Sequence, residues 1–205
     1  MSNKIKLLGN LHRGLLFIVS APAGTGKTTL VKMLTEEFSC VQRSISTTTR
    51  AMRKGEVKDV DYHYVDTHTF LEEVEEGVFL EHATVYNHMY GTSRKTVEKQ
   101  LSSGNHVVLV IDTQGAKQIK HKMSAISIFI RPPSFDDLQK RLEERNTESK
   151  EEIALRLSWA KDEMEKCRTY DYQIINSDIK SSYDVLRSIF IAEEHRLSAL
   201  NNQEK

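Results

Sequence analysis

Residues 15–28 read LLFIVSAPAGTGKT and carry the strongest structural signal in the chain. The first five of these residues are continuously apolar, which is typical of a strand that is buried on both faces of a parallel sheet. Residues 21–28 match the phosphate-loop pattern G-x-x-x-x-G-K-[ST] except at the first position, where Ala21 stands. Because a phosphate loop joins a strand to a helix, we expect a helix over about residues 28–37. The run predicts an α/β fold with a site for ATP or GTP.

The loop has the groups that hold a nucleoside triphosphate. Gly24 and Gly26 let the backbone curl so that consecutive N–H groups point at phosphate oxygens. We expect Lys27 to reach the β- and γ-phosphates and the Thr28 hydroxyl to ligate Mg²⁺. A glycine-bearing turn without a ligand is the alternative, but Gly-x-Gly-Lys-Thr between a strand and a helix favours the nucleotide site. The expected ATP-contacting residues here are Ala21, Pro22, Ala23, Gly24, Thr25, Gly26, Lys27, Thr28 and Thr29.

Beyond the loop, apolar runs alternate with segments of helical period. The further apolar runs are residues 106–111, 125–130 and 172–175. Helices are expected over residues 151–166 and 183–200, and another opens at Ser134 after two prolines. This alternation is typical of a parallel sheet flanked by helices. We therefore expect a single α/β domain over residues 1–205.

Two segments do not fit this parallel core. Residues 44–92 are rich in threonine, tyrosine and charge, and short antiparallel strands are expected at residues 61–65 and 79–90. Residues 141–157 are dense in arginine and glutamate. We interpret both segments as insertions that cover the sheet edge where ligands bind.

Composition narrows the class of protein. Lys plus Arg equals Asp plus Glu, at 29 each, and this balance argues against a general nucleic-acid binder. The two cysteines form no close pair, which favours free thiols in a reducing compartment. The longest apolar stretch is far shorter than the roughly 20 residues of a membrane-spanning helix. We therefore expect a cytoplasmic protein without nucleic-acid or membrane partners, whose oligomeric state stays open.

An acidic residue and a basic loop are candidates for phosphate chemistry. Asp112 ends an apolar run, where a carboxylate can hold Mg²⁺ through water, although capping the next helical turn is the alternative. On a strand, Val110 and Asp112 would point to the same face. Arg50 and Arg53 lie in a hydroxyl-rich loop and could bind a second phosphate bidentately, although a solvated basic turn explains the composition equally well.

Several motifs together resemble the guanylate kinase family. They are the phosphate loop, SISTTTRAMRKGE of residues 44–56, Asp61-Tyr62, Glu81, Tyr90-Gly91-Thr92 and IDTQGA of residues 111–116. The resemblance implies a phosphate-loop nucleoside-monophosphate-kinase-like fold that moves the γ-phosphoryl of ATP to GMP, and also to dGMP, in purine nucleotide metabolism. The implied division is a core of about residues 14–43, 93–135 and 158–200, a GMP-binding insertion of about residues 44–92 and a lid of about residues 136–157.

The resemblance also implies roles for individual residues. The GMP phosphate is held by Arg50, Arg53, Tyr62 and Tyr90, and the guanine base is read by Ser46, Glu81 and Thr92. Gly91 also belongs to the implied GMP site. Catalytic charge is supplied by Lys27, Arg141, Arg145 and Arg156, and Asn176 lies near the adenine of ATP. For Arg141 and Arg145, ordinary (i, i+4) pairing with neighbouring glutamates explains the spacing as well. Trp159 is interpreted as a packing residue.

Guanine recognition by Glu81 has a physical basis. Guanine presents N1–H and N2–H₂ as adjacent donors, and one carboxylate accepts both, whereas adenine would leave that carboxylate unpaired. One departure from the family is Val110, which stands where an acid is usual in D-I-D. Two other functions are weighed against the phosphotransferase: an inactive module that binds phosphopeptides, and a kinase for another nucleoside monophosphate. The intact phosphate loop and Glu81 argue against them.

Overall fold

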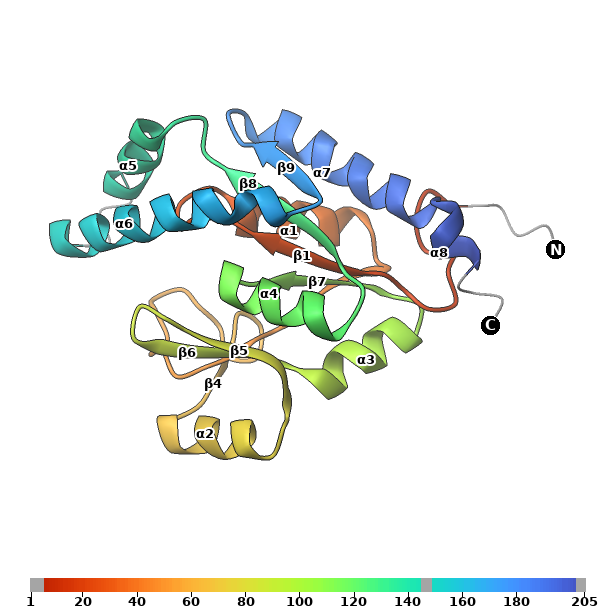
Figure 1. The fold of residues 1–205 in the computed structure, drawn as a ribbon, viewed down its shortest axis with the longest axis horizontal. Helices are drawn as coiled ribbons and strands as arrows, with labels where there is room; N and C mark the ends of the chain where they lie inside the picture. The colour runs from red at the N-terminus through yellow and green to blue at the C-terminus, as the bar shows by residue number, and fades with distance from the viewer. Residues whose placement is uncertain (1–5, 145–148, 202–205) are drawn as a thin grey trace.

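The computed structural model describes residues 6–144 and 149–201. A five-stranded parallel sheet lies at its centre, in the order β2-β7-β1-β8-β9 (Figure 1). The strands are β1 (Leu16–Ser20), β2 (Val41–Arg43), β7 (His106–Val110), β8 (Ile126–Arg131) and β9 (Tyr172–Ile175). Because β1 is the middle strand, the phosphate loop leaves the sheet at its centre. The expected α/β fold with a parallel sheet flanked by helices is confirmed.

Alternate residues of β1 serve opposite faces of the sheet. Phe17 and Val19 pack in one core with α1 (Lys27–Glu37) and α7 (Ile179–Glu194). Leu16 and Ile18 pack in a second core. That core includes residues of α3 (Arg94–Ser102) and α4 (Thr113–Lys122). Each fully buried side chain of this size stabilises the fold by about 1.5–3 kcal/mol, which explains why the strand is continuously apolar.

A second, smaller sheet lies below the first in Figure 1, in the order β4-β3-β6-β5. Its elements are β3 (Thr47–Thr48), β4 (His63–Tyr64), β5 (Phe79–Val85) and β6 (His88–Ser93), with α2 (Thr67–Glu75) beneath them. The prediction of an antiparallel strand at residues 61–65 is wrong in direction, because β4 pairs parallel with β3. The expected strand over residues 79–90 is divided at Tyr86 and Asn87, where the chain turns into a hairpin.

Two helices project together at one end of the molecule (Figure 1). They are α5 (Phe135–Glu143) and α6 (Lys150–Lys166), and Leu138, Leu142 and Ala160 pack between them. A short 3₁₀ turn, η1 (Cys167–Thr169), leads from α6 to β9.

The predicted last helix has different bounds. It begins at Ile179, because the Asp178 side chain accepts the Ser181 N–H and caps it. It ends at Glu194, and a separate short helix, α8 (Leu197–Asn201), follows. The prediction of one helix over residues 183–200 therefore began too late and missed the break at His195.

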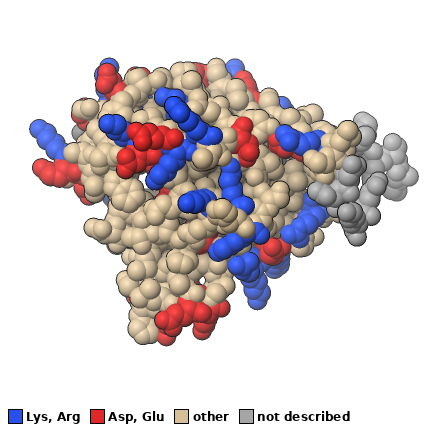
Figure 2. Space-filling model, in the orientation of Figure 1, with Lys and Arg blue, Asp and Glu red and all other residues tan. Residues whose placement is uncertain are grey.

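On the face shown in Figure 2, side chains of both charge signs are interspersed. Lys and Arg gather across the middle, and an acidic group lies at the lower tip, where α2 carries the exposed Glu72 and Glu75. In residues 6–144 and 149–201, every helix is too short or too polar to cross a bilayer.

Candidate active site

The phosphate loop has the backbone shape that its glycines predict. Gly24 and Gly26 have φ values of 92° and 88°, in the left-handed region where a Cβ is unfavourable. The buried Thr25 stabilises the loop, because its hydroxyl donates to the Pro22 carbonyl at 2.8 Å. The Asn176 amide donates to the Thr25 carbonyl at 2.7 Å. Asn176, which directly follows the edge strand β9, therefore fixes the loop's shape.

The helix that follows the loop begins differently from the others. Helices α2 to α7 each have an N-cap side chain that accepts a hydrogen bond from the first turn: Asp66, Ser93, Asp112, Ser134, Ser149 and Asp178. Helix α1 has Gly26 at this position, which has no side chain to do so. The N–H groups and positive dipole end of α1 are thus available for an anion.

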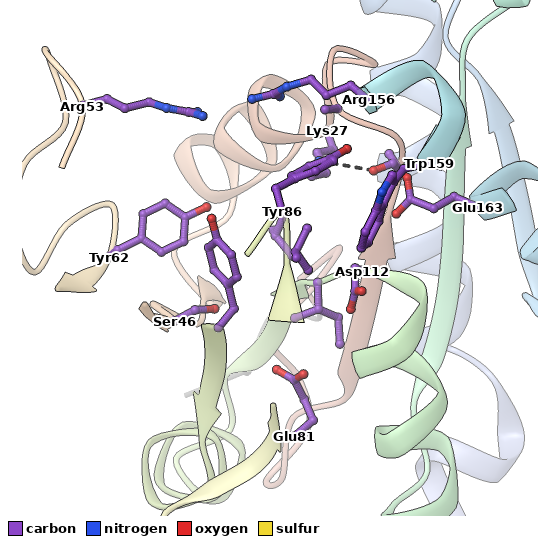
Figure 3. Close-up of a pocket in the computed structure, with 16 residues that line it drawn as sticks. Lys27, Ser46, Arg53, Tyr62, Glu81, Tyr86, Asp112, Arg156, Trp159 and Glu163 are labelled. Carbon is purple, nitrogen blue, oxygen red and sulfur yellow. Dashed lines mark hydrogen bonds between the residues drawn. The ribbon is translucent and has the colours of Figure 1, made fainter. Parts of the chain in front are cut away.

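A cleft of about 180 Å³ separates the phosphate loop from the second sheet. Lys27 lies on one side, and Ser46, Tyr62 and Glu81 lie on the other (Figure 3). Ala21 of the phosphate loop also lines this cleft. A second hollow of about 270 Å³ shares several of these residues and adds Thr28, Thr29 and Arg50. Residues from segments far apart in the sequence therefore converge on one continuous cleft.

The basic loop of the second sheet is held in shape by Glu56. Arg50, which is only 8% exposed, donates to Glu56 at 2.6 Å and lies over the Tyr62 ring at 5.3 Å. The Arg53 backbone N–H and the Tyr64 hydroxyl also donate to Glu56. Burial alone would raise the pKa of Glu56, but these hydrogen bonds outweigh it and lower that pKa to about 2. An anionic Glu56 thus fixes Arg50 beside the cleft.

Tyr90 completes this side of the cleft. Its ring lies 5.9 Å from the Tyr62 ring, edge to face. Tyr62, Tyr90, Arg50 and Arg53 all line the second hollow. The four residues that the sequence assigned to one phosphate are therefore brought together.

Glu81 lies at the bottom of the cleft and is 2% exposed. The antiparallel register of β5 and β6 places it opposite Thr92, whose hydroxyl donates to Glu81 at 2.5 Å. Burial raises the pKa of Glu81 to about 7, against the lowering effect of that hydrogen bond. Gly115 leaves the room for it, since a Cβ there would lie 2.3 Å from a Glu81 oxygen. Gly91 is buried against the Phe79 ring and lies outside the lining of either hollow.

The arginines predicted for the lid fall in different places. Arg156 on α6 lines the cleft, and its guanidinium points toward that of Arg53 (Figure 3). Arg141 on α5 donates to the Asn176 carbonyl at 2.9 Å. It lines a separate hollow with Gly24 and Gly26. Arg145 lies outside the described residues.

Asp112 lies just beyond β7 and caps α4, as the alternative to a metal role predicted. Its carboxylate accepts the Gly115 N–H at 2.9 Å. It also lines the cleft beside Val110, so the two side chains face the same space as expected. Val110 packs partly into the adjoining core. The Asp112 side chain therefore caps α4 and also lines the cleft.

The donor atoms in the cleft suit a hard cation. Thr28 offers a hydroxyl and Asp112 a carboxylate, both of which are oxygen ligands. In the part of the chain that the structure describes, no group of three or more His, Cys, Asp or Glu could hold a metal. Mg²⁺ fits this set, because it usually takes one or two protein ligands and completes its shell with phosphates and water.

The comparisons with known proteins agree with this geometry. The family model described as guanylate kinase matches residues 13–193. The chain belongs to the guanylate kinase family. It is 54% identical over 190 residues to a guanylate kinase of Protochlamydia amoebophila (strain UWE25), covering 93% of this chain and 96% of that relative. It is 45% identical over 194 residues to a guanylate kinase of Legionella pneumophila (strain Paris), covering 94% and 93%.

A solved structure extends the likeness to three dimensions. The crystal structure of guanylate kinase from Anaplasma phagocytophilum has a TM-score of 0.75 and 34% identity, covering 94% of this chain and 91% of that one. The fold of this guanylate kinase family member is therefore shared with a solved member of the family.

Several cleft residues of this guanylate kinase family member were given no role by the sequence reasoning, and three of them are aromatic or acidic. Tyr86, Trp159 and Glu163 line the cleft, although Trp159 was interpreted only as a packing residue (Figure 3). Burial raises the pKa of Glu163 to about 7 despite the nearby charge of Lys27. Tyr86 and Trp159 come from different segments and only meet in the folded chain, so a pattern along the sequence could not reveal their contact. The spacing of Trp159 and Glu163 from Arg156, one and two helical turns, is the signal that was available.

Proposed function

We propose that this protein transfers the γ-phosphoryl group of ATP to GMP, and to dGMP, giving ADP and the guanosine diphosphate. One observation carries the proposal: Glu81, a buried carboxylate suited to guanine, shares a cleft with Lys27 of the phosphate loop. The base of the acceptor, GMP, would bind at Glu81, and the phosphates of the donor, ATP, would bind at Lys27 on the opposite side of the cleft. Membership of the guanylate kinase family supports the same reaction.

On the acceptor side, the base and the phosphate have separate partners. Glu81 accepts the two adjacent guanine donors, and Ser46 contributes a hydroxyl from the same wall. Thr92 acts through Glu81, because its hydroxyl orients that carboxylate. Arg50, Arg53 and the two tyrosines near them hold the phosphate, since guanidinium forks match phosphate oxygens.

On the donor side, the loop N–H groups and Lys27 hold the β- and γ-phosphates. Thr28 and Asp112 are the residues that would hold Mg²⁺, which neutralises phosphate charge when bound. Arg156 faces the cleft and stabilises charge on the moving phosphoryl group, while Arg141 and Asn176 serve the outer side of the loop. No general base is required, because phosphoryl transfer depends mainly on positioning and charge.

The test is a coupled assay of ADP release with GMP, dGMP, AMP, CMP and UMP as acceptors. We expect turnover with GMP and dGMP and at least about a hundredfold lower kcat/KM with the other three, because a buried acceptor that is left unpaired rejects the wrong base. Equal turnover with AMP would refute guanine specificity. No turnover with any acceptor would support the inactive interaction module instead. We also propose that the protein acts in the cytoplasm, where both nucleotides are available.

A further inference from the structure

The tip of the β5–β6 hairpin has an unusual residue for its backbone shape. Tyr86 and Asn87 have φ values of 48° and 62°, so both central residues of the turn are in the left-handed region. Such turns favour Asn, Asp and Gly, and Asn87 fits this preference. A bulky aromatic residue at this position strains the backbone. Contacts outside the hairpin are therefore expected to stabilise Tyr86 at this position.

These contacts are made across the cleft, with two side chains of α6. The Tyr86 ring is 5.0 Å from the Trp159 ring, at an interplanar angle of 45°. The guanidinium of Arg156 lies 5.3 Å from the centre of the same Tyr86 ring. Trp159 and Arg156 are three residues apart on α6, so they lie on one face of that helix. Figure 3 shows the Tyr86 ring facing Trp159 and lying beneath Arg156.

We propose that Tyr86 is a positioning residue that clamps the second sheet to α6 and holds Arg156 over the cleft. Its ring packs at a tilt against the Trp159 ring, and its face holds the Arg156 cation by a cation–π contact. Arg156 is thereby kept pointing toward Arg53 (Figure 3). Under the proposed function, this is the space that the transferring phosphoryl group crosses. The kinetic consequence rests on the proposed function, but the contact itself does not.

The chain has a built-in reporter of this contact. Trp159 is its one tryptophan, so intrinsic tryptophan emission comes from the clamp alone. Three variants separate the ring from the turn. Tyr86→Gly removes the ring and suits the positive φ. Tyr86→Phe keeps the ring, and the control Asn87→Gly alters the turn while leaving Tyr86 in place.

We expect Tyr86→Gly to shift Trp159 emission to longer wavelength and to increase acrylamide quenching in nucleotide-free protein. Its melting temperature should stay close to that of the wild type, because relief of the backbone strain offsets the lost ring contacts. Its kcat should fall about tenfold or more, because Arg156 is no longer aimed. The KM values for GMP and ATP should stay within about threefold, since ground-state binding does not use the clamp. Asn87→Gly should match the wild type in emission and kcat, and Tyr86→Phe should recover both relative to Tyr86→Gly.

Unchanged emission and quenching in Tyr86→Gly would overturn the contact. A shifted emission with an unchanged kcat would overturn the positioning role. A Tyr86→Phe variant as slow as Tyr86→Gly would place the effect in the hydroxyl rather than the ring and would also overturn it. An inactive wild type would remove the proposed function and the positioning role together, whereas an active wild type with a fully active Tyr86→Gly would overturn this inference alone.

Discussion

At the bottom of the cleft, the carboxyl group of Glu81 has a pKa close to neutral, so both of its protonation states matter for GMP binding. Burial raises its pKa to about 7, and the charge of Asp112 adds to this, while the Thr92 hydrogen bond and Lys122 act in the opposite direction. A protonated carboxyl has a donor where guanine also presents a donor. GMP therefore binds the ionised form, and a protein molecule in which Glu81 is protonated has to release that proton when GMP binds.

We predict that GMP binding releases a proton from Glu81 and becomes tighter as the pH rises from 6 to 8. The ionised fraction grows as the pH passes the free-protein pKa, so affinity falls below about pH 7 and levels off above it. Isothermal titration calorimetry in two buffers with different ionisation enthalpies measures the released proton. The phosphate of GMP also titrates near pH 6. Proton release is therefore compared with that of Glu81→Gln, which keeps the contribution of the phosphate and loses that of Glu81.

The same variant measures the value of the base contact. Glu81→Gln presents an amide donor to guanine's donors. We expect kcat/KM for GMP to fall by an amount that corresponds to a loss of about 2–4 kcal/mol in transition-state stabilisation. A variant with unchanged GMP kinetics and unchanged proton release would show that Glu81 does not read the base.

Lys27 is predicted to act on the reaction rather than on the fold. Its ammonium group lies in the cleft and donates to the Ala21 carbonyl at 3.3 Å. Lys27→Ala should lower kcat by about a hundredfold or more, because a preorganised charge near the transferring group is lost. Circular dichroism and GMP affinity should stay close to wild type. A variant that retains a tenth of the wild-type kcat would contradict this role.

Helix α4 begins at a residue with two functions, and a pair of substitutions can separate them. Asp112→Asn keeps a good N-cap but loses the charge, whereas Asp112→Ala loses both. Only the Ala variant should be destabilised, by about 1 kcal/mol in the free energy of unfolding. Both should lose turnover to a similar degree and require more Mg²⁺. Chemical denaturation and Mg²⁺ titrations of activity provide the readouts. An Asn variant with full turnover would leave Asp112 as a helix cap only.

Elements with a strong local pattern were predictable, and those fixed by tertiary contacts were not. The strand before the phosphate loop was recognisable because both faces of β1 are buried, which makes it continuously apolar. β3 and β4 have two residues each, too few for a pattern, and the direction of β4 depends on its neighbour. The hairpin turn at Tyr86 was missed because it contains no glycine.

The candidate site divides along the same line. Lys27 and Thr28 belong to a local motif with its own chemistry, so sequence alone predicts them. Glu81 became visible only through a family resemblance, because its burial comes from pairing with a distant strand. The contact between Tyr86 and Trp159 joins two segments that approach each other only in the folded chain.

Across the whole molecule, one buried carboxylate joins the two ends of the described chain. Glu194 at the end of α7 is fully buried and accepts the backbone N–H groups of Gly9 and Asn10. It also pairs with His106 at 2.5 Å. The Leu15 N–H donates to the other nitrogen of that ring, so the proton lies on the nitrogen that faces Glu194. Burial would raise the pKa of Glu194, but these bonds outweigh it and lower that pKa to about 2.

We predict that Glu194→Gln lowers the free energy of unfolding by about 2–4 kcal/mol, because several buried donors lose a charged acceptor. Urea denaturation measures the loss, and kcat per folded molecule should not change, since this corner lies outside the cleft. The control is Glu37→Gln on α1, which alters a partly exposed ion pair with Arg187 of α7 and the hydrogen bond from Tyr183, and it should cost less than about 1 kcal/mol. An equal loss of unfolding free energy in the two variants would contradict a special role for the buried Glu194.

The central position of β1 also bears on how the protein is made. A ribosome delivers β1 before either of its neighbours, β7 and β8, so both edges of β1 stay unpaired until residues 106–131 have been synthesised. During that delay an apolar segment is exposed on the nascent chain, where it is open to aggregation. The β5–β6 hairpin, by contrast, pairs with itself as it emerges. The acceptor half of the cleft is therefore expected to fold before the donor half, and translation speed and chaperone binding should affect yield through β1.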